Sequence, residues 1–225
     1  MSLLLNIDTA LETGSVCLCK NGTIIGSSVN HRQHDHAAWL HPAIHELLVN
    51  HKLEASHLDA IAVTIGPGSY TGLRIGLSAA KGLCYALGKP LITVGTLEVL
   101  ASLVVDEADQ LICPVIDARR MEIFTAIYNK ALQLISEPGA MVLLQDSFSD
   151  ILKDQKVLFC GNAVTKMQTV IESPNASFTN KNFTALHLAP LAYQRFNVGS
   201  FADLAYTEPL YLKEFYFLQP KVKGN

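Results

Sequence analysis

The sequence lacks the long apolar runs of a membrane protein. No uninterrupted apolar segment approaches the roughly 20 residues that a membrane-spanning helix needs. The first residues, MSLLLNIDT, have neither the basic region nor the apolar region of a secretory signal. Charge is also scarce, since 16% of the 225 residues are charged and 49% are apolar, a composition typical of a compact globular protein. We therefore expect a cytoplasmic protein of one or two domains with no membrane association.

The sequence also lacks a cluster of positive charge and a metal-binding or disulfide pattern of cysteines. The 17 Lys and Arg residues are scattered, and the net charge is −3, so no basic stripe is available to neutralise several phosphates of a nucleic acid. The five cysteines show neither CxxC nor His spacing, which argues against a zinc site or a disulfide framework. We expect five reduced core thiols, namely Cys17, Cys19, Cys84, Cys113 and Cys160.

The first half of the chain predicts three strands followed by alternating helices and strands. Asn21-Gly22 joins two of the strands and is a strong hairpin signal. Gly88 and Pro90 mark the end of one helix. The predicted strands are 3–9, 15–20, 23–30, 58–65 and 91–94, and the predicted helices are 35–51, 71–87 and one that begins near Thr96.

The same order of elements begins again at Leu111. Strands are predicted at 111–117, 121–128, 132–135 and 157–160, and helices at 146–153 and 185–196. Residues 172–182 read mainly as a polar loop, and His187 as a capping or half-buried residue. The repetition predicts an α/β fold made of two copies of one unit.

Asp8 and Thr9 follow the opening strand, where a carboxylate can hold a metal–phosphate complex. The segment IGPGSYTGLRIG, residues 65–76, then links a strand to a helix, and exposed amides at such a helix start can bind an anion. The segment is neither a P-loop nor a full dinucleotide fingerprint. The candidate nucleotide or phosphate-binding residues are Asp8, Thr9, Gly66 and Gly68, with the alternative that the first two simply end the strand.

Histidines are frequent around the first helix. His41 and His45 are four residues apart and can project from one helical face. A zincin would place Glu directly after the first His, but Pro42 is there, so we expect no functional metal site. The alternative is fortuitous metal affinity.

The helix predicted at 71–87 contains three glycines, each of which costs about 1 kcal/mol relative to Ala. Its small residues recur at helical spacing and form a smooth face, Gly72, Gly76, Ala79, Ala80 and Leu83. Such a face lets another element approach closely, either within the fold or in a partner. Further along, Asp117-Ala118-Arg119 begins a charged link between two strands, which reads as a solvated turn or as a ligand-facing segment of a cleft between lobes.

Four segments together resemble the bacterial TsaB (YeaZ) family. They are LLLNIDTALETGSVCL, VTIGPGSYTGLRIGLSAAKGLCYALGKPLITVGTLEVLA, the Asp117 to Arg119 motif and EPLYLKE near the C-terminus. The resemblance implies an actin-like ATPase (ribonuclease H-like) fold of two lobes, each a βββαβα unit. The lobes are expected at 1–105 and 106–225. It also implies a part in making threonylcarbamoyladenosine in tRNA.

The resemblance further implies a role without catalysis. In the related transferase TsaD, two metal-binding histidines follow the glycine loop in a His-x-x-x-His pattern, and these positions align with Thr96 and Leu100 here. Neither side chain replaces an imidazole, so we expect an inactive paralogue with no catalytic residue and no metal. No cofactor is expected to bind tightly, although ATP or ADP can lie at the boundary between subunits.

The partners implied are a TsaD-like transferase subunit that this chain activates, a TsaE-like P-loop ATPase, and a second copy when TsaD is absent. Contact with tRNA is expected only through the complex. The helices 35–51 and 71–87 are expected to form the pairing surface. Its expected residues are Trp39, Ala43, Leu47, Gly72, Gly76, Ala79, Ala80 and Leu83. Two alternatives remain open, a free-standing ATP-dependent small-molecule kinase that uses Asp8 and a metallopeptidase that uses His41 and His45.

Overall fold

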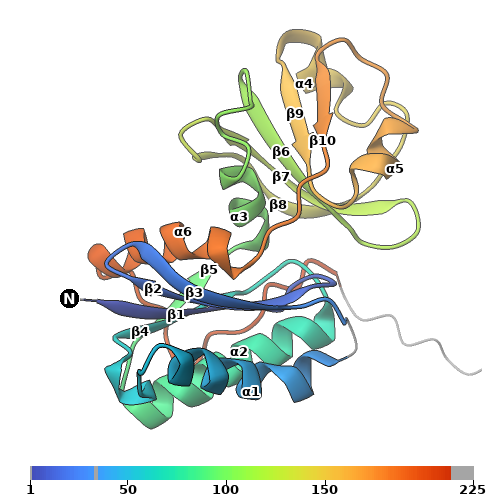
Figure 1. Cartoon of the computed structure of the whole chain (residues 1–225). Helices are drawn as coiled ribbons and strands as arrows, with labels where there is room; N and C mark the ends of the chain where they lie inside the picture. The colour runs from blue at the N-terminus through green and yellow to red at the C-terminus, as the bar shows by residue number, and fades with distance from the viewer. Residues whose placement is uncertain (1, 33–34, 214–225) are drawn as a thin grey trace, which may run out of the picture.

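The computed structural model describes residues 2–32 and 35–213 and contains two five-stranded sheets, one in each lobe (Figure 1). The strand order is β3-β2-β1-β4-β5 in the first sheet and, read from the matching edge, β8-β7-β6-β9-β10 in the second. Each strand of the second sheet therefore takes the place of the strand five earlier in the chain. The predicted α/β fold with a duplicated βββαβα unit is confirmed.

The first sheet and its helices follow the sequence pattern closely. The elements are β1 (Leu3–Asp8), β2 (Gly14–Lys20), β3 (Thr23–Asn30), α1 (His36–Asn50), η2 (Ala55–His57), β4 (Ala60–Thr64), α2 (Tyr70–Leu87), β5 (Leu91–Val94) and α3 (Thr96–Ser102). Asn21 and Gly22 both adopt positive φ, 49° and 82°, as the predicted hairpin turn between β2 and β3 requires. Gly88 ends α2 in the left-handed conformation, also as predicted.

The second sheet departs from the predictions at three places. Its elements are β6 (Leu111–Asp117), β7 (Glu122–Asn129), β8 (Leu134–Val142), α4 (Ser149–Asp154), β9 (Val157–Cys160), α5 (Val164–Gln168), β10 (Ala176–Thr179) and α6 (Ala185–Asn197). β8 continues to Val142, beyond the predicted end, and α5 was not predicted. β10 lies where a polar loop was predicted. As an edge strand of four residues that pairs only with β9, it carries too short a pattern to be recognised.

The last helix of each unit packs against the other unit. α3 contacts β6 and β7 of the second sheet, and α6 lies across β1, β2, β4 and β5 of the first sheet. α6 covers the face of the first sheet opposite to α1 and α2 (Figure 1). The boundary expected at residue 105 separates the two sheets, but the chain from α6 onward returns to the first lobe. The second lobe expected at 106–225 therefore includes α6 and residues 202–210, which in the structure lie against the first lobe.

We call residues 202–213 the C-terminal strap, because they run along the first lobe and end at the second. Ala202 N donates a hydrogen bond to Leu91 O, and Leu210 N donates one to Ile65 O, at 2.8 and 2.7 Å. At its far end, Lys213 forms an ion pair with Glu122 of β7. The strap thus connects both lobes directly. Glu214, the last residue of the predicted EPLYLKE motif, lies outside the described residues.

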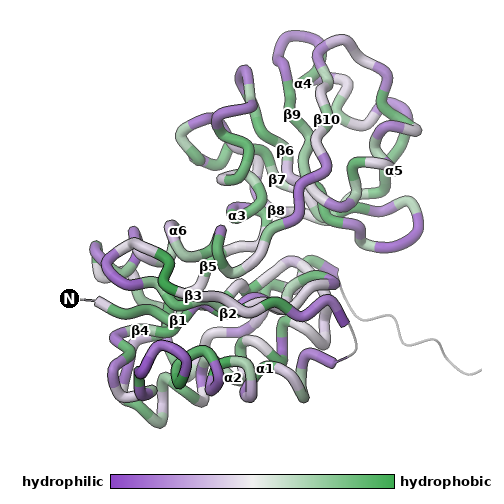
Figure 2. The backbone as a smooth tube through the Cα atoms, viewed as in Figure 1, coloured by the Kyte–Doolittle hydropathy of each residue, from purple (hydrophilic) through white to green (hydrophobic). Residues whose placement is uncertain are grey.

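Apolar residues are concentrated in the strands and on the inner sides of the helices, while the connecting loops are more hydrophilic (Figure 2). All five cysteines are buried and free, as predicted. In the described residues, none of the helices has the length and apolar character to cross a membrane.

Candidate functional site

A cleft of about 730 Å³ lies between the two lobes. The first lobe contributes the β1–β2 loop and the start of α2, the second lobe contributes the ends of β6 and β9, and the strap closes one side. The lining residues are Ala10, Leu11, Glu12, Pro67, Gly68, Ser69, Tyr70, Thr71, Ile116, Asp117, Ala118, Arg119, Phe124, Asn162, Leu210, Tyr211, Leu212 and Lys213. The predicted Asp117-Ala118-Arg119 segment is therefore part of a cleft wall.

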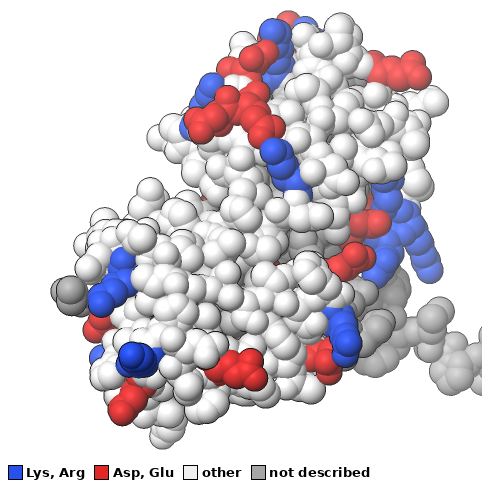
Figure 3. All heavy atoms as spheres, viewed as in Figure 1, with Lys and Arg blue, Asp and Glu red and all other residues white. Residues whose placement is uncertain are grey.

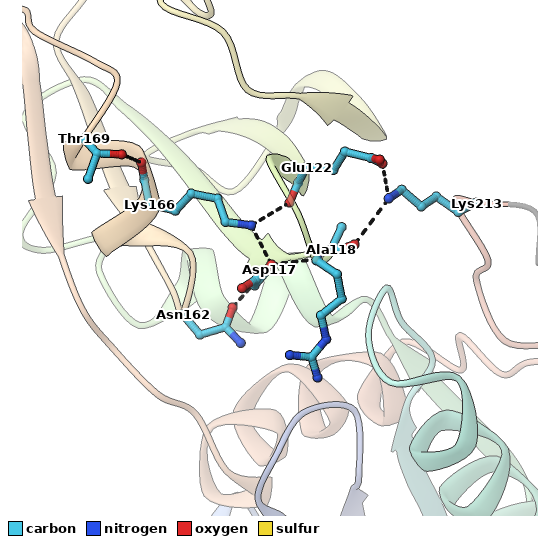
Figure 4. Close-up of polar contacts among 8 residues, drawn as sticks. Asp117, Ala118, Glu122, Asn162, Lys166, Thr169 and Lys213 are labelled. Atoms are coloured by element: carbon cyan, nitrogen blue, oxygen red, sulfur yellow. Dashed lines mark hydrogen bonds and ion pairs between the residues drawn. The ribbon is translucent and has the colours of Figure 1, made fainter. Parts of the chain in front are cut away.

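Asp117 is held in a polar cluster that closes the second-lobe wall (Figure 4). Its Oδ1 accepts hydrogen bonds from Lys166 Nζ at 2.6 Å and from Arg119 N at 2.7 Å, and its own N donates to Asn162 Oδ1 at 2.9 Å. Partial burial raises the pKa of the Asp117 carboxyl, but the Lys166 and Arg119 contacts outweigh it and hold that pKa below its ordinary value. Asp117 is thus an ionised carboxylate whose Oδ1 is held by Lys166 and by the backbone of Arg119.

Arg119 differs from Asp117 in its exposure. It adopts φ of 71°, a strained backbone conformation for a side chain of this size, and it is exposed to solvent beside the cleft. Within the described chain, its guanidinium has neither a hydrogen-bond acceptor nor an ion-pair partner. The sequence did not indicate the residues around this wall, Asn162, Lys166 and Lys213, because they come from two segments that only the fold brings beside Asp117.

The four candidate nucleotide residues are not collected in the cleft. Asp8 is fully buried and accepts hydrogen bonds from Thr64 Oγ1 at 2.6 Å and from Ala10 N at 3.2 Å. Burial raises its pKa to about 6 despite these bonds. Thr9 is also buried and donates its hydroxyl hydrogen to Gly72 O at 2.7 Å. Of the four, only Gly68 lines the cleft, so these four residues supply no exposed carboxylate for a metal–phosphate complex.

The start of α2 presents ordered aromatic and basic groups at the strap side of the cleft. Ser69 caps the helix by accepting a hydrogen bond from Gly72 N at 3.2 Å. The rings of Tyr70 and Tyr211 are 5.0 Å apart between centroids. Arg74 lies over the Tyr70 ring at 4.0 Å and donates to Tyr211 Oη at 2.9 Å. These contacts fix the strap against α2.

A second hollow of about 360 Å³, which we call the α1–α2 groove, opens on the outer side of the first lobe. Its lining residues are Ala37, Leu40, His41, Ile75, Ser78, Ala79, Gly82 and Leu83. His41 is the only titratable residue among them. The groove is therefore an apolar surface feature formed jointly by the two helices that were expected to bind a partner.

Most of the residues expected to form that surface lie on the sides of α1 and α2 that face the first sheet. Gly72 and Gly76 face β1, and a Cβ at either position would overlap with Thr9, closer than side chains approach in real proteins. Ala43, Leu47 and Ala80 are buried in the same core. These five positions therefore pack inside the first lobe, where small residues let α2 lie close to the sheet beneath it, and their part in an interface stays a prediction.

The remaining expected interface residues reach the surface or line the groove, although Ala79 is itself buried. Ala79 and Leu83 line the groove, and Trp39 is half-buried beside Gly14 of β2. Gly82 and Ile75, which were not selected, also line it. Gly82 is the one glycine of α2 at which an added Cβ would meet no other part of the chain within 4 Å, which only the structure shows.

The histidines divide into structural and exposed ones. His187 accepts a hydrogen bond from Thr184 N at 2.9 Å and forms the capping box of α6, as expected. His51 bonds to the carbonyl groups of Leu47 and Ile25, while His41 and His45 are exposed on α1. His34 lies outside the described residues. Across the described ranges, no group of three or more His, Cys, Asp or Glu residues is placed to hold a metal ion.

Comparison with known proteins identifies the family. The family model described as "TsaD: tRNA N6-adenosine threonylcarbamoyltransferase" matches residues 23–207. The tRNA threonylcarbamoyladenosine biosynthesis protein TsaB of Bacillus subtilis is 35% identical over 172 residues, 75% of each chain. The chain belongs to the TsaB (YeaZ) family. TsaB of Escherichia coli is 32% identical over 128 residues, 56% of this chain and 55% of that protein.

Solved structures agree with the TsaB family assignment. A crystal structure described as an uncharacterized protein with similarity to peptidase YEAZ from Pseudomonas aeruginosa has a TM-score of 0.83 and 27% identity. The match covers 95% of this chain and 100% of that one. A ROK family protein from Streptococcus pneumoniae, with a TM-score of 0.52 and 8% identity over 88% of this chain and 99% of that one, shares only the fold. The predicted actin-like fold is thus confirmed alongside the TsaB family.

Proposed function

We propose that this chain is a non-catalytic subunit in the synthesis of threonylcarbamoyladenosine in tRNA, and that it pairs with and activates a TsaD-like transferase through the α1–α2 groove. The pathway is suggested by its TsaB relatives, which are named as tRNA threonylcarbamoyladenosine biosynthesis proteins. The single observation that carries the pairing is the groove itself, an apolar hollow at the surface between two rigid helices. Apolar grooves of this kind take up side chains of a partner helix.

A role without catalysis is supported by the environment of α3. Thr96 and Leu100, which align with the metal-binding histidines of TsaD, are both fully buried, and Leu100 belongs to the core cluster that the two lobes share. Neither position faces an open cavity in which a substrate and a metal ion could meet. The burial of Asp8 argues in the same direction, because a kinase of this fold needs that carboxylate accessible to a metal–nucleotide complex.

The surface charge supports indirect contact with tRNA. On the face drawn in Figure 3, basic side chains lie in separate groups, interspersed with acidic ones and surrounded by uncharged residues. We infer that tRNA is held by the complex rather than by this chain alone. We also propose that a TsaE-like P-loop ATPase is the third partner. ATP or ADP is proposed to bind at the boundary between the subunits.

The experiment is a binding measurement with the substitution Gly82→Glu. No atom lies within 4 Å of a Cβ at Gly82, so the side chain fits without disturbing the chain's own packing. An ionised carboxylate in an apolar groove that a partner covers should weaken pairing at least about tenfold, because a buried charge without a partner is costly. Calorimetry of the purified chain against a TsaD-like subunit gives the dissociation constant.

The matched control is Gly139→Glu in β8, on the second lobe, where a new Cβ meets only Glu137 O, at an ordinary contact distance of 4.0 Å. It adds the same charge away from the groove and should leave pairing unchanged. Equal affinity of the Gly82→Glu variant and the unmodified chain would rule out the groove as the pairing surface. Calorimetry with ATP and Mg²⁺ tests the kinase alternative, which requires nucleotide binding by the chain alone.

A further inference from the structure

His41 and His45 are the exposed histidines of α1, whereas His36, the third histidine of this helix, is buried. His51, His57 and His187 each form hydrogen bonds to the backbone, whereas His41 and His45 have no hydrogen-bond or ion-pair partner in the described parts of the chain. Both are exposed on a regular α-helix. A spacing of four residues places two imidazoles on one face of a helix, where they can bind one metal ion together.

The surface around this pair carries little charge and is partly apolar. Ala37, His41, His45 and Val49 recur every four residues and form one exposed stripe along α1, which we call the histidine stripe. Val49 leaves 56% of its surface in solvent, and Ala37 and His41 also line the α1–α2 groove. No charged residue belongs to the stripe, although Glu46 is exposed beside it. The stripe can therefore pack against another helix without burying an ion.

One copy of the chain cannot complete a metal site here. Zn²⁺ in proteins takes four ligands in a tetrahedral arrangement. The histidine stripe supplies two, and among the residues that the structure describes no third His, Cys, Asp or Glu joins them. A two-fold symmetric pair of chains doubles every ligand, since a symmetric interface brings the same patch of both copies together.

We propose that His41 and His45 bind Zn²⁺ and that the same two histidines of a second copy complete a four-histidine site, so that zinc joins two chains along α1. This inference rests on the proposed function in one respect: both place a protein–protein contact on the α1 side of the first lobe. The crossing point of the two helices lies at the histidine pair, and Ala37 and Val49 at either side supply apolar contact. Four neutral imidazoles supply the four ligands of a tetrahedral Zn²⁺ site, two from each chain.

Sedimentation of the full chain without a histidine tag tests this, with ZnCl₂ and with EDTA. Zinc should tighten self-association at least about tenfold and should bind at one ion per two chains. The double variant His41→Ala/His45→Ala should lose this response, and the single variant His45→Gln should weaken it. The control His31→Ala removes an exposed histidine outside α1 and should keep it.

Three results would overturn the inference: no change of mass with zinc, one zinc per chain without dimers, or a zinc response that survives in the double variant. Circular dichroism establishes that the variants keep their helices, which is expected because both side chains are exposed. Pairing with a TsaD-like subunit is measured separately in EDTA. If the chain binds the TsaD-like subunit in EDTA but zinc does not change its self-association, only the zinc site is refuted. If the chain does not bind the TsaD-like subunit, the result counts against the proposed function.

Discussion

Two glycines of α2 should respond in opposite directions to the same substitution. Gly76 and Gly82 are six residues apart in one helix, and replacing either by Ala gains about 1 kcal/mol of helix propensity. At Gly82 the new methyl group meets open space. We therefore expect Gly82→Ala to raise the free energy of unfolding by about 1 kcal/mol.

At Gly76 the propensity gain is outweighed. The new Cβ would overlap with the Thr9 hydroxyl, which is buried and donates to Gly72 O at 2.7 Å. Overpacking of a filled core costs about 1–3 kcal/mol. Loss of that buried hydrogen bond costs about 1–3 kcal/mol more. After subtraction of about 1 kcal/mol for propensity, Gly76→Ala should lower the free energy of unfolding by about 1–5 kcal/mol.

Urea unfolding followed by circular dichroism measures both variants under identical conditions. The reasoning is refuted if Gly76→Ala is as stable as the unmodified chain, because α2 would then have room above β1. A third variant, Thr9→Ser, keeps the hydroxyl and serves as a check on the hydrogen bond. Its stability should lie near that of the unmodified chain, whereas Thr9→Val should be destabilised by about 1–3 kcal/mol.

Two further predictions concern charged side chains, one buried and one pair half-buried. Because burial raises the pKa of Asp8 from 3.8 to about 6, the folded chain binds this proton more tightly than the unfolded chain. Ionisation therefore removes stability as the pH rises from about 4 to 6, and Asp8→Asn should gain about 3 kcal/mol relative to the unmodified chain over that window, at 1.36 kcal/mol per pKa unit. Urea unfolding at pH 4 and pH 7 checks this, and a constant difference between the two proteins would contradict it. Arg195 of α6 donates to both carboxylate oxygens of Glu98 in α3, at 2.9 and 2.7 Å, and to Thr93 O at 2.6 Å. Arg195→Met should therefore cost about 2 kcal/mol. In a double-mutant cycle with Glu98→Gln the two losses should be less than additive, and strict additivity would show that the pair is not coupled.

Local patterns in the sequence were sufficient for most of the first lobe. The Asn21-Gly22 turn, the apolar run before Gly66 and the Gly88 stop signal each act over a few residues, so their structural outcome depends little on the rest of the chain. The repeat of element order was also readable, because duplicated units keep the same succession of strands and helices. The motifs of the glycine loop were specific enough to indicate the family before any fold was known.

The direction in which a helical face points was not readable in the same way. A stripe of small residues on α2 indicates close packing, but it fits a sheet below the helix and a partner above it equally well. The burial of Asp8 was likewise hidden, since a carboxylate at a strand end is exposed or covered depending on β4 and the loop that follows it.

The sequence by itself determined the duplicated α/β fold and the family, because both depend on short-range patterns and local motifs. Only the tertiary structure decided which surfaces are available for function. It turned Gly72 and Gly76 inward onto β1, left Gly82 open beside the α1–α2 groove, and brought Asp117, Asn162 and Lys213 together from distant segments. Those placements depend on contacts between residues far apart in the chain, which no local pattern records.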